Sequence, residues 1–187
     1  MGKIILDLCG GTGAWSRPYK EVGYDVRNIT SPDYDVRTYQ PPENVYGILA
    51  APPCTMFSLA RTTAKTPRDF KKGMELVSAC FEIIWKCRYK NKLAFWAIEN
   101  PRAILRQFLG KPTFTFYQWE FGDFGLKPTD IWGYFKNPVK KYKERPKGMT
   151  KKYPCGSSNI IGWGGLNIEK KATTPAGFAK AFYEANK

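Results

Sequence analysis

Three short clusters along the sequence carry residue types that can do covalent chemistry, and each cluster directly follows an apolar, strand-like run. The clusters are Asp7-Leu8-Cys9-Gly10-Gly11-Thr12-Gly13, Pro53-Cys54 and Glu99-Asn100-Pro101. A glycine-rich turn after a strand lets a cofactor approach the backbone. A cysteine thiolate is a nucleophile, and a carboxylic acid can donate a hydrogen bond to an atom of a reacting ring. Together they predict a cofactor-dependent site built around Cys54.

Methylation at carbon 5 of cytosine needs this set of groups. That carbon is a poor nucleophile because it belongs to an aromatic ring. A thiolate that adds to carbon 6 makes carbon 5 enamine-like, and an acid bonded to ring nitrogen 3 relieves the charge that develops. Cys54 is therefore the candidate nucleophile, and Glu99 is the candidate acid. Cys54 follows a strand-like run, where backbone dipoles and basic side chains lower a thiol pKa.

The elements that position these residues alternate between strands and helices. The apolar pattern predicts strands at 3–8, 25–30, 46–51, 93–98, 113–121 and 131–135, a long amphipathic helix at 67–90, and a closing helix at 176–185. This order predicts an α/β fold with a mostly parallel sheet and helices on both faces. In such a sheet, ligands bind beyond the carboxyl ends of the strands, so the three clusters should meet in one crevice.

The charge balance points to a polyanionic partner. Thirty Lys and Arg residues against sixteen Asp and Glu residues give a formal net charge of +14, and such an excess favours nucleic acid. We expect one domain over residues 1–187, with a basic excursion at about 134–172. The candidate phosphate-binding residues are Arg61, Lys65, Lys140, Lys141 and Lys143.

Other residue counts exclude several classes of site. The chain has no histidine, and its five cysteines form no CxxC pair, so we expect no metal site. Cysteines without a disulfide framework suit a reducing compartment. The apolar run at the start is too short for a signal peptide or a membrane span. We therefore expect a cytoplasmic protein without a membrane partner.

The three clusters resemble the first, fourth and sixth motifs of the cytosine-5 DNA methyltransferases. Residues 123–132 resemble the eighth motif of that family, and Asp35-Val36 resembles the third. The resemblance implies a Rossmann-like S-adenosylmethionine-dependent methyltransferase fold, with DNA as substrate. It implies Cys54 as nucleophile, Glu99 as acid, and cofactor binding by the first and third motifs. The supporting pocket would comprise Pro53, Asn100, Ser58, Lys127 and Thr129.

The sequence departs from the family pattern at several positions. Cys9 replaces the aromatic residue that stacks on adenine, residues 30–32 (Thr-Ser-Pro) replace the acid that holds the ribose, and Lys127 and Thr129 stand where an arginine is usual. Only about forty residues follow the eighth motif before the faint final one, in place of a target-recognition domain. This compact layout resembles enzymes encoded by bacteriophages, which would act in the host cytoplasm.

Several other functions remain open on the sequence alone. A tRNA cytosine methyltransferase or an enzyme acting on a free cytosine nucleotide would use the same residues, and a nucleic-acid-binding homologue that has lost catalysis would keep the basic surface. An amino-methyltransferase is disfavoured because Ala51 cannot accept a hydrogen bond from an exocyclic amine. A nicotinamide oxidoreductase would explain the glycine turn but neither Cys54 nor Glu99.

Overall fold

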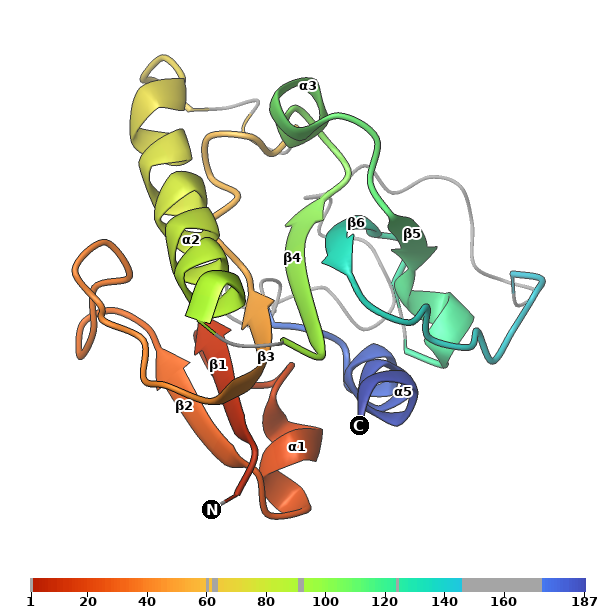
Figure 1. Ribbon diagram of the computed structural model, residues 1–187. Helices are drawn as coiled ribbons and strands as arrows, with labels where there is room; N and C mark the ends of the chain where they lie inside the picture. The colour runs from red at the N-terminus through yellow and green to blue at the C-terminus, as the bar shows by residue number, and fades with distance from the viewer. Residues whose placement is uncertain (1, 60, 62–63, 91–92, 124, 146–172) are drawn as a thin grey trace.

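A six-stranded mixed sheet forms the centre of the computed structural model (Figure 1), which describes residues 2–59, 61, 64–90, 93–123, 125–145 and 173–187. The strands are β1 (Ile4–Leu8), β2 (Asp25–Ile29), β3 (Val45–Ala50), β4 (Phe95–Pro101), β5 (Phe114–Tyr117) and β6 (Pro128–Tyr134). Their order in the sheet is β2-β1-β3-β4-β6-β5. The first four strands are parallel, and β6 runs antiparallel to both of its neighbours. The predicted α/β, mostly parallel sheet is confirmed.

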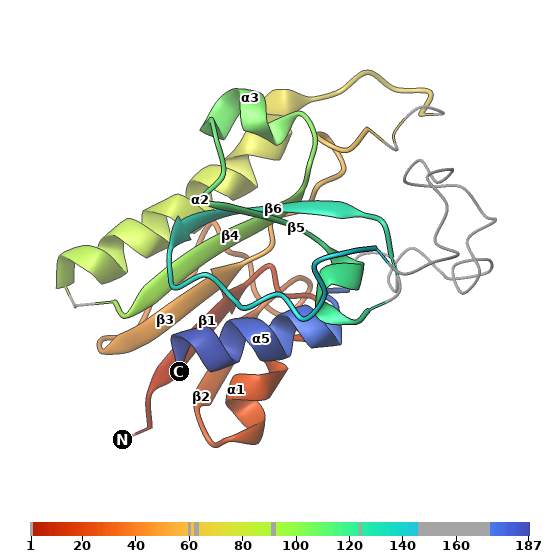
Figure 2. The same ribbon diagram turned by 90° about the vertical axis from the view of Figure 1, so that its right-hand side faces the viewer.

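The helices cover both faces of this sheet, as Figure 2 shows. One face packs against α2 (Phe70–Lys90), and the other packs against α1 (Arg17–Glu21) and α5 (Ala176–Asn186). A short helix, α3 (Leu105–Leu109), and a 3-10 helix, η1 (Gln118–Phe121), complete the elements. Residues spaced three and four apart on α2 and α5 face the sheet, because that spacing puts them on one side of a helix.

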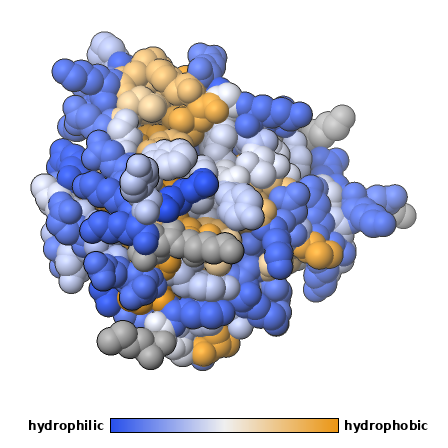
Figure 3. Space-filling view, viewed as in Figure 1, coloured by the Kyte–Doolittle hydropathy of each residue, from blue (hydrophilic) through white to orange (hydrophobic). Residues whose placement is uncertain are grey.

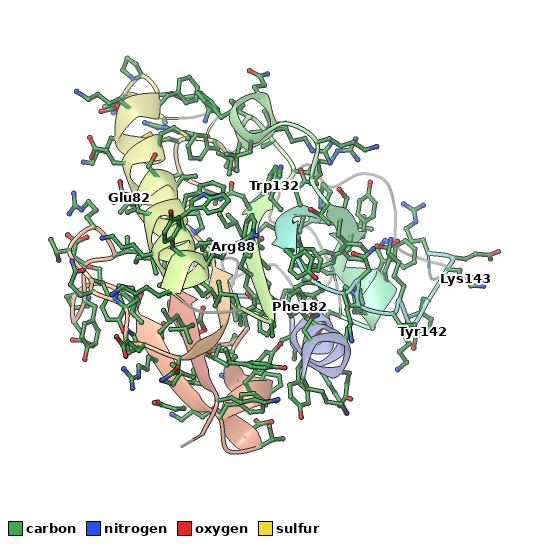
Figure 4. The ribbon with its side chains drawn as sticks, viewed as in Figure 1. Glu82, Arg88, Trp132, Tyr142, Lys143 and Phe182 are labelled. Atoms are coloured by element: carbon green, nitrogen blue, oxygen red, sulfur yellow. The ribbon has the colours of Figure 1, made fainter. Side chains whose placement is uncertain are left out.

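The two helical layers bury different kinds of side chain. Below α2 the core is mainly aliphatic, with Ile83 and Ile84 packed near Leu6 and Ile48. The opposite layer is aromatic: the ring of Phe178 stacks on that of Phe116 with centroids 3.9 Å apart. Phe182, labelled in Figure 4, projects from α5 into the same layer. These two cores fix the strands, and with them the edge where the strands end.

The structure corrects several predicted element bounds. The long helix begins at Phe70 rather than at 67, because Asp69 accepts a hydrogen bond from the Lys72 amide and caps the helix. The run predicted as one strand at 113–121 divides after Tyr117, where η1 begins. At this point the Glu120 side chain accepts a hydrogen bond from the Tyr117 amide. The strand predicted at 131–135 spans Pro128–Tyr134. The five-residue helices α1 and α3 were too short to predict from periodicity.

The face of the molecule shown in Figure 3 is mostly hydrophilic, with an apolar area over the upper end of α2, next to α3. At this end of α2 the ring of Phe70 packs against that of the exposed Phe108, with centroids 5.4 Å apart.

In the part of the chain that the structure describes, no helix has the length and apolar character needed to cross a membrane.

Candidate active site at the carboxyl edge of the sheet

The three predicted clusters lie at the carboxyl ends of three adjacent parallel strands and therefore share one edge of the sheet. Leu8 of β1 is in register with Ala50 of β3, and Ala50 is in register with Ile98 of β4. The amide of Ala51 also donates to the Leu8 carbonyl at 2.9 Å. Glu99 continues β4 directly beyond Ile98. The arrowheads of β1, β3 and β4 point toward this common edge in Figure 1.

A buried hydrogen bond ties the cysteine cluster to the glutamate cluster. The side-chain amide of Asn100 donates to the carbonyl oxygen of Pro52 at 2.9 Å. Asn100 and Pro52 are both buried, whereas Pro53 is exposed and Cys54 is half-buried. Because Pro52 lies beyond the end of β3, a side chain rather than a neighbouring strand satisfies its carbonyl, and this bond holds the start of the cysteine loop beside β4.

Cys54 stands at the first position of a tight turn. Its carbonyl oxygen accepts hydrogen bonds from the amides of Phe57 at 2.9 Å and Ser58 at 2.8 Å. Phe57 is fully buried, and its ring stacks on that of Phe70. A Cβ on Gly73 of α2 would stand 3.0 Å from the Phe57 ring, so the glycine lets α2 lie directly against this turn. The backbone that carries the thiol is therefore held from two sides.

Arg68 anchors the same loop and was not found by sequence reasoning. Its two terminal guanidinium nitrogens donate to the carbonyl oxygens of Met56 at 2.8 Å and Ser58 at 2.9 Å. The planar fork of arginine is suited to holding two carbonyls at once. A basic residue just before a helix cap carries no signal in the sequence that would separate this role from a solvent-exposed one.

Glu99 is half-buried on β4, in surroundings that favour its neutral form. Burial raises the pKa of its carboxyl group, and the negative charge of Asp130 acts in the same direction. The positive charge of Lys127, just before β6, opposes them. Raised carboxyl pKa values of this kind are typical of groups that donate a proton or a hydrogen bond near neutral pH. Glu99 therefore has the environment that the predicted acid needs.

An ion pair on the neighbouring strands supports this region. Arg106 of α3 binds the fully buried carboxylate of Asp130 through two nitrogens, and Thr115 donates to the same carboxylate at 2.8 Å. Asp130 lies opposite Asn100 in the β4–β6 register, and the buried Thr129 lies opposite Pro101. Sequence reasoning did not identify Arg106, because only the antiparallel pairing of β6 with β4 brings Asp130 to this position.

The glycine turn is held by polar side chains of β1 and β2. The hydroxyl of Ser16 donates to the buried carboxylate of Asp7 at 2.6 Å. Asn28 donates to the Gly11 carbonyl at 2.9 Å, and the Gly11 amide donates to Thr30 at 3.2 Å. Thr30, just after β2, therefore helps to hold the turn.

The glycines of the turn are required for two different reasons. A Cβ on Gly10 would lie 2.5 Å from Asp7 Oδ1 and 2.6 Å from Asn28 Oδ1, so a side chain has no room there. Gly11 and Gly13 have positive φ angles of 52° and 68°, which favour glycine. A Cβ on Gly11 would contact no described atom within 4 Å, so its outer side is open to a ligand.

Two buried oxygens beside this turn, Asp7 Oδ1 and Asn28 Oδ1, have no hydrogen-bond partner among the described residues. Burial raises the pKa of Asp7 to about 6. A protonated Asp7 would have a donor to offer to such an oxygen, which fits the raised pKa.

Of the other predicted cofactor residues, Leu8 and Val36 are buried in the aliphatic core. Asp35 forms an exposed ion pair with Arg37 at 2.6 Å, which lowers the pKa of Asp35 to about 2. Cys9 lies at the end of β1 with a positive φ of 55°, half-buried. The Asp35 carboxylate is therefore charged, and it is already paired with Arg37.

The predicted phosphate-binding residues divide into two groups. Arg61 donates to Thr66 and to the Pro67 carbonyl within its own loop, whereas Lys65 is exposed. Lys140 forms an ion pair with Glu120 at 2.8 Å, so it already has an acidic partner within the chain. Lys141 and Lys143 are exposed.

Figure 4 labels Lys143 on the segment after β6. Lys141 also lines a hollow of about 550 Å³ beside α5. The rest of the predicted basic excursion, residues 146–172, lies outside the described residues.

No described group of three or more Cys, Asp or Glu side chains is arranged to hold a metal ion.

No model of a protein family matches the sequence, and no curated protein matches it either. Cys54, Glu99 and the glycine turn thus share one edge of a mostly parallel sheet.

Proposed function

We propose that this protein is an S-adenosylmethionine-dependent methyltransferase that acts on carbon 5 of cytosine in DNA, with Cys54 as covalent nucleophile. The observation that carries the proposal is the hydrogen bond from Asn100 to Pro52. It holds the strand end that bears Glu99 beside the turn that bears Cys54, and the glycine turn follows the adjacent strand. A nucleophile, an acid and a cofactor turn on neighbouring strand ends are the set that this reaction requires.

We also propose that the sheet is of the Rossmann-like methyltransferase type. Its strand order, with the antiparallel β6 inserted between β4 and β5, supports this assignment. The cofactor would be held by the glycine turn. No described atom lies within 4 Å of the place where a Gly11 side chain would stand, and the positive φ of Gly11 favours glycine. S-adenosylmethionine, when bound there, supplies an electrophilic methyl group.

The residues of the chain perform the remaining steps. The Cys54 thiolate adds to carbon 6 of the cytosine ring, and a carbon–sulfur bond forms while electron density moves toward carbon 5. Glu99, whose pKa is raised by burial, donates a hydrogen bond to ring nitrogen 3 and stabilises that charge. After methylation, loss of the proton from carbon 5 and cleavage of the carbon–sulfur bond restore the aromatic ring and release Cys54.

The substrate must reach Cys54 as an unstacked base, because a base inside a duplex cannot contact the thiol. We therefore propose that DNA binds with its target cytosine flipped out or already single-stranded. The exposed cations Lys65, Lys141 and Lys143 supply phosphate contacts that carry little sequence information. This favours strongly salt-dependent binding and a short target sequence.

A labelling experiment tests the proposal. The protein is incubated with tritiated S-adenosylmethionine and, in separate reactions, duplex DNA, single-stranded DNA, tRNA or dCMP, and the labelled nucleoside is identified after digestion. We expect 5-methyldeoxycytidine from DNA. Label only in tRNA or in the mononucleotide would replace DNA as the substrate, and no label in any reaction, with no binding of S-adenosylhomocysteine, would refute the proposal.

A further inference from the structure

Three phenylalanine rings from three separate segments meet beside the turn that carries Cys54. The ring of Phe57, in that turn, has its centroid 6.2 Å from that of Phe70 at the start of α2 and 5.9 Å from that of Phe108 on α3. The rings of Phe70 and Phe108 also contact each other, with centroids 5.4 Å apart. Phe57 is fully buried, whereas Phe108 is 46% exposed. The three rings therefore extend from the interior beside the nucleophile to the surface.

Backbone hydrogen bonds fix the position of α3 relative to Cys54. The Cys54 carbonyl accepts a hydrogen bond from the Phe57 amide at 2.9 Å, and the Phe57 carbonyl accepts one from the Ile104 amide at 3.2 Å. Ile104 directly precedes α3, and α3 begins only a few residues after β4, the strand that bears Glu99. Phe108 is thus connected to both candidate catalytic residues through short segments.

The segments that carry these rings are rich in positive charge. Exposed cations lie at the start of α2, between β4 and α3, and directly after α3; they are Lys71, Lys72, Arg102 and Lys111. The exposed acids of the same segments are Asp69 and Glu75, and Asp69 already caps α2. Figure 3 shows hydrophilic side chains on both sides of the apolar area at this end of α2. A surface of this kind attracts a polyanion.

The exposed part of Phe108 has the size of one base rather than of a protein interface. An aromatic side chain buries about 150–250 Å² in a core, so a ring that is 46% exposed offers on the order of 100 Å². A stable protein interface needs about 800 Å² from each partner. An unstacked base presents a single flat aromatic face, and stacking of bases on aromatic side chains is a general way in which proteins hold single strands.

We propose that Phe108 is a substrate-binding residue, on which a base of single-stranded DNA next to the target cytosine stacks. The position of that base rests on the proposed function, because only that function places a cytosine at Cys54. A cytosine that enters the site leaves the next base of the strand without its stacking partner, and the Phe108 ring replaces that partner. The nearby cations hold the phosphates on either side.

Photo-cross-linking tests the contact without reference to activity. Single-stranded oligonucleotides carry one cytosine among thymines, and one thymine at a time is replaced by 5-iododeoxyuridine, which cross-links to an aromatic side chain stacked on it. After irradiation the linked peptide is identified by mass spectrometry. We expect a link to Phe108 from a position next to the cytosine and much less from distant positions. No link to Phe108, or equal links from every position, would overturn the proposal.

Fluorescence anisotropy with the same oligonucleotides measures what the ring contributes. Phe108→Ala should weaken binding by about fivefold to a hundredfold, the loss expected for one stacked base. Phe108→Leu keeps apolar packing against Phe57 and Phe70 without a flat ring and should weaken binding similarly, whereas Phe108→Trp should retain it. Tyr89→Ala is the matched control, because Tyr89 is 95% exposed at the other end of α2. Wild-type affinity in Phe108→Leu would refute the stacking.

Steady-state methyl transfer distinguishes substrate binding from support of the Cys54 turn. In Phe108→Leu the KM for DNA should rise while kcat stays unchanged, because Cys54 and Glu99 are intact. A fall in kcat at unchanged KM would show that Phe108 only supports the turn. Loss of a dimer in Phe108→Leu, with unchanged DNA affinity, would assign the rings to a second copy of the chain. A cross-link next to the cytosine in a chain that transfers no methyl group would refute the methyltransferase and leave the stacking contact standing.

Discussion

The side-chain amide of Asn100 donates a hydrogen bond of 2.9 Å to the carbonyl oxygen of Pro52. These residues are 48 positions apart in the sequence, and both are buried. The bond joins the end of β4 to the segment between β3 and Cys54. It therefore links the position of Glu99 to that of Cys54.

Replacing Asn100 by Ala should damage both the fold and the reaction. Loss of the donor leaves the Pro52 carbonyl buried without its partner, which costs about 1–3 kcal/mol of unfolding free energy. Methyl transfer should fall further than stability alone explains, because the cysteine turn is no longer tied to β4. Urea unfolding and labelled-methyl transfer measure the two effects. Asn137→Ala, at an exposed position, is the control, and an Asn100→Ala variant that matches it in both assays would contradict this account.

Arg68 should matter for the reaction more than for folding. Arg68→Ala removes the donors to the Met56 and Ser58 carbonyls, so the turn after Cys54 loosens while the core stays packed. We expect the methyl-transfer rate to fall by about tenfold or more, since a displacement of about 1 Å at a reacting group costs up to a hundredfold, with unchanged cofactor affinity. Arg88→Ala, on the exposed end of α2 and labelled in Figure 4, is the matched control. Equal rates in the two variants would show that Arg68 does not position Cys54.

The sequence was sufficient to predict the elements that repeat a regular pattern. The spacing of apolar residues revealed α2 and α5, and the apolar runs revealed β1, β3 and β4 together with the edge that they share. Asp69 shows why the bounds were harder to predict. Its side-chain cap decides where α2 starts, three residues after the proline that suggested an earlier start.

The residues that support the site were harder to predict than the candidate catalytic residues. Cys54 and Glu99 stand in recognisable local motifs, but Arg68 and Arg106 act through carbonyls and carboxylates that only folding brings near them. Lys140 was predicted as a phosphate ligand from its charge alone, and the ion pair with Glu120 that the structure gives it had no signal in the sequence.

Asp7 should make the folded state less stable as pH rises. Burial raises its folded pKa to about 6 from an ordinary value of 3.8, so between these values the folded chain holds a proton that the unfolded chain has lost. The stability that this proton provides is complete below the lower value and is lost as pH rises through the higher one, by up to about 3 kcal/mol in all. Asp7→Asn removes this penalty and keeps an acceptor for Ser16.

Urea unfolding at pH 4 and pH 8 measures the effect of Asp7→Asn. We expect the variant to be more stable than the wild type at pH 8 and close to it at pH 4. A variant that is destabilised at pH 8 would show instead that the Asp7 carboxylate stabilises the fold.

The exposed lysines after β6 should contribute to DNA binding through charge alone. Changing both Lys141 and Lys143 to Ala should weaken binding equally on all sequences and reduce the salt slope by about one unit for each phosphate that is no longer bound. Lys140→Ala is the control, because that lysine already pairs with Glu120. Fluorescence anisotropy between about 50 and 200 mM salt gives the slopes. A larger loss of DNA affinity in Lys140→Ala than in the double variant would show that Lys140, and not Lys141 and Lys143, contacts the phosphates.

Trapping of the covalent intermediate tests the central claim most directly. DNA containing 5-fluorocytosine is incubated with the protein and S-adenosylmethionine, and the products are separated under denaturing conditions and mapped by mass spectrometry. Because fluorine cannot leave as a proton does, we predict a stable adduct between Cys54 and the modified base. The adduct should be absent from Cys54→Ala and present in Cys87→Ser. Methyl transfer to ordinary DNA by Cys54→Ala at the wild-type rate, or an adduct mapped to another residue, would contradict the account.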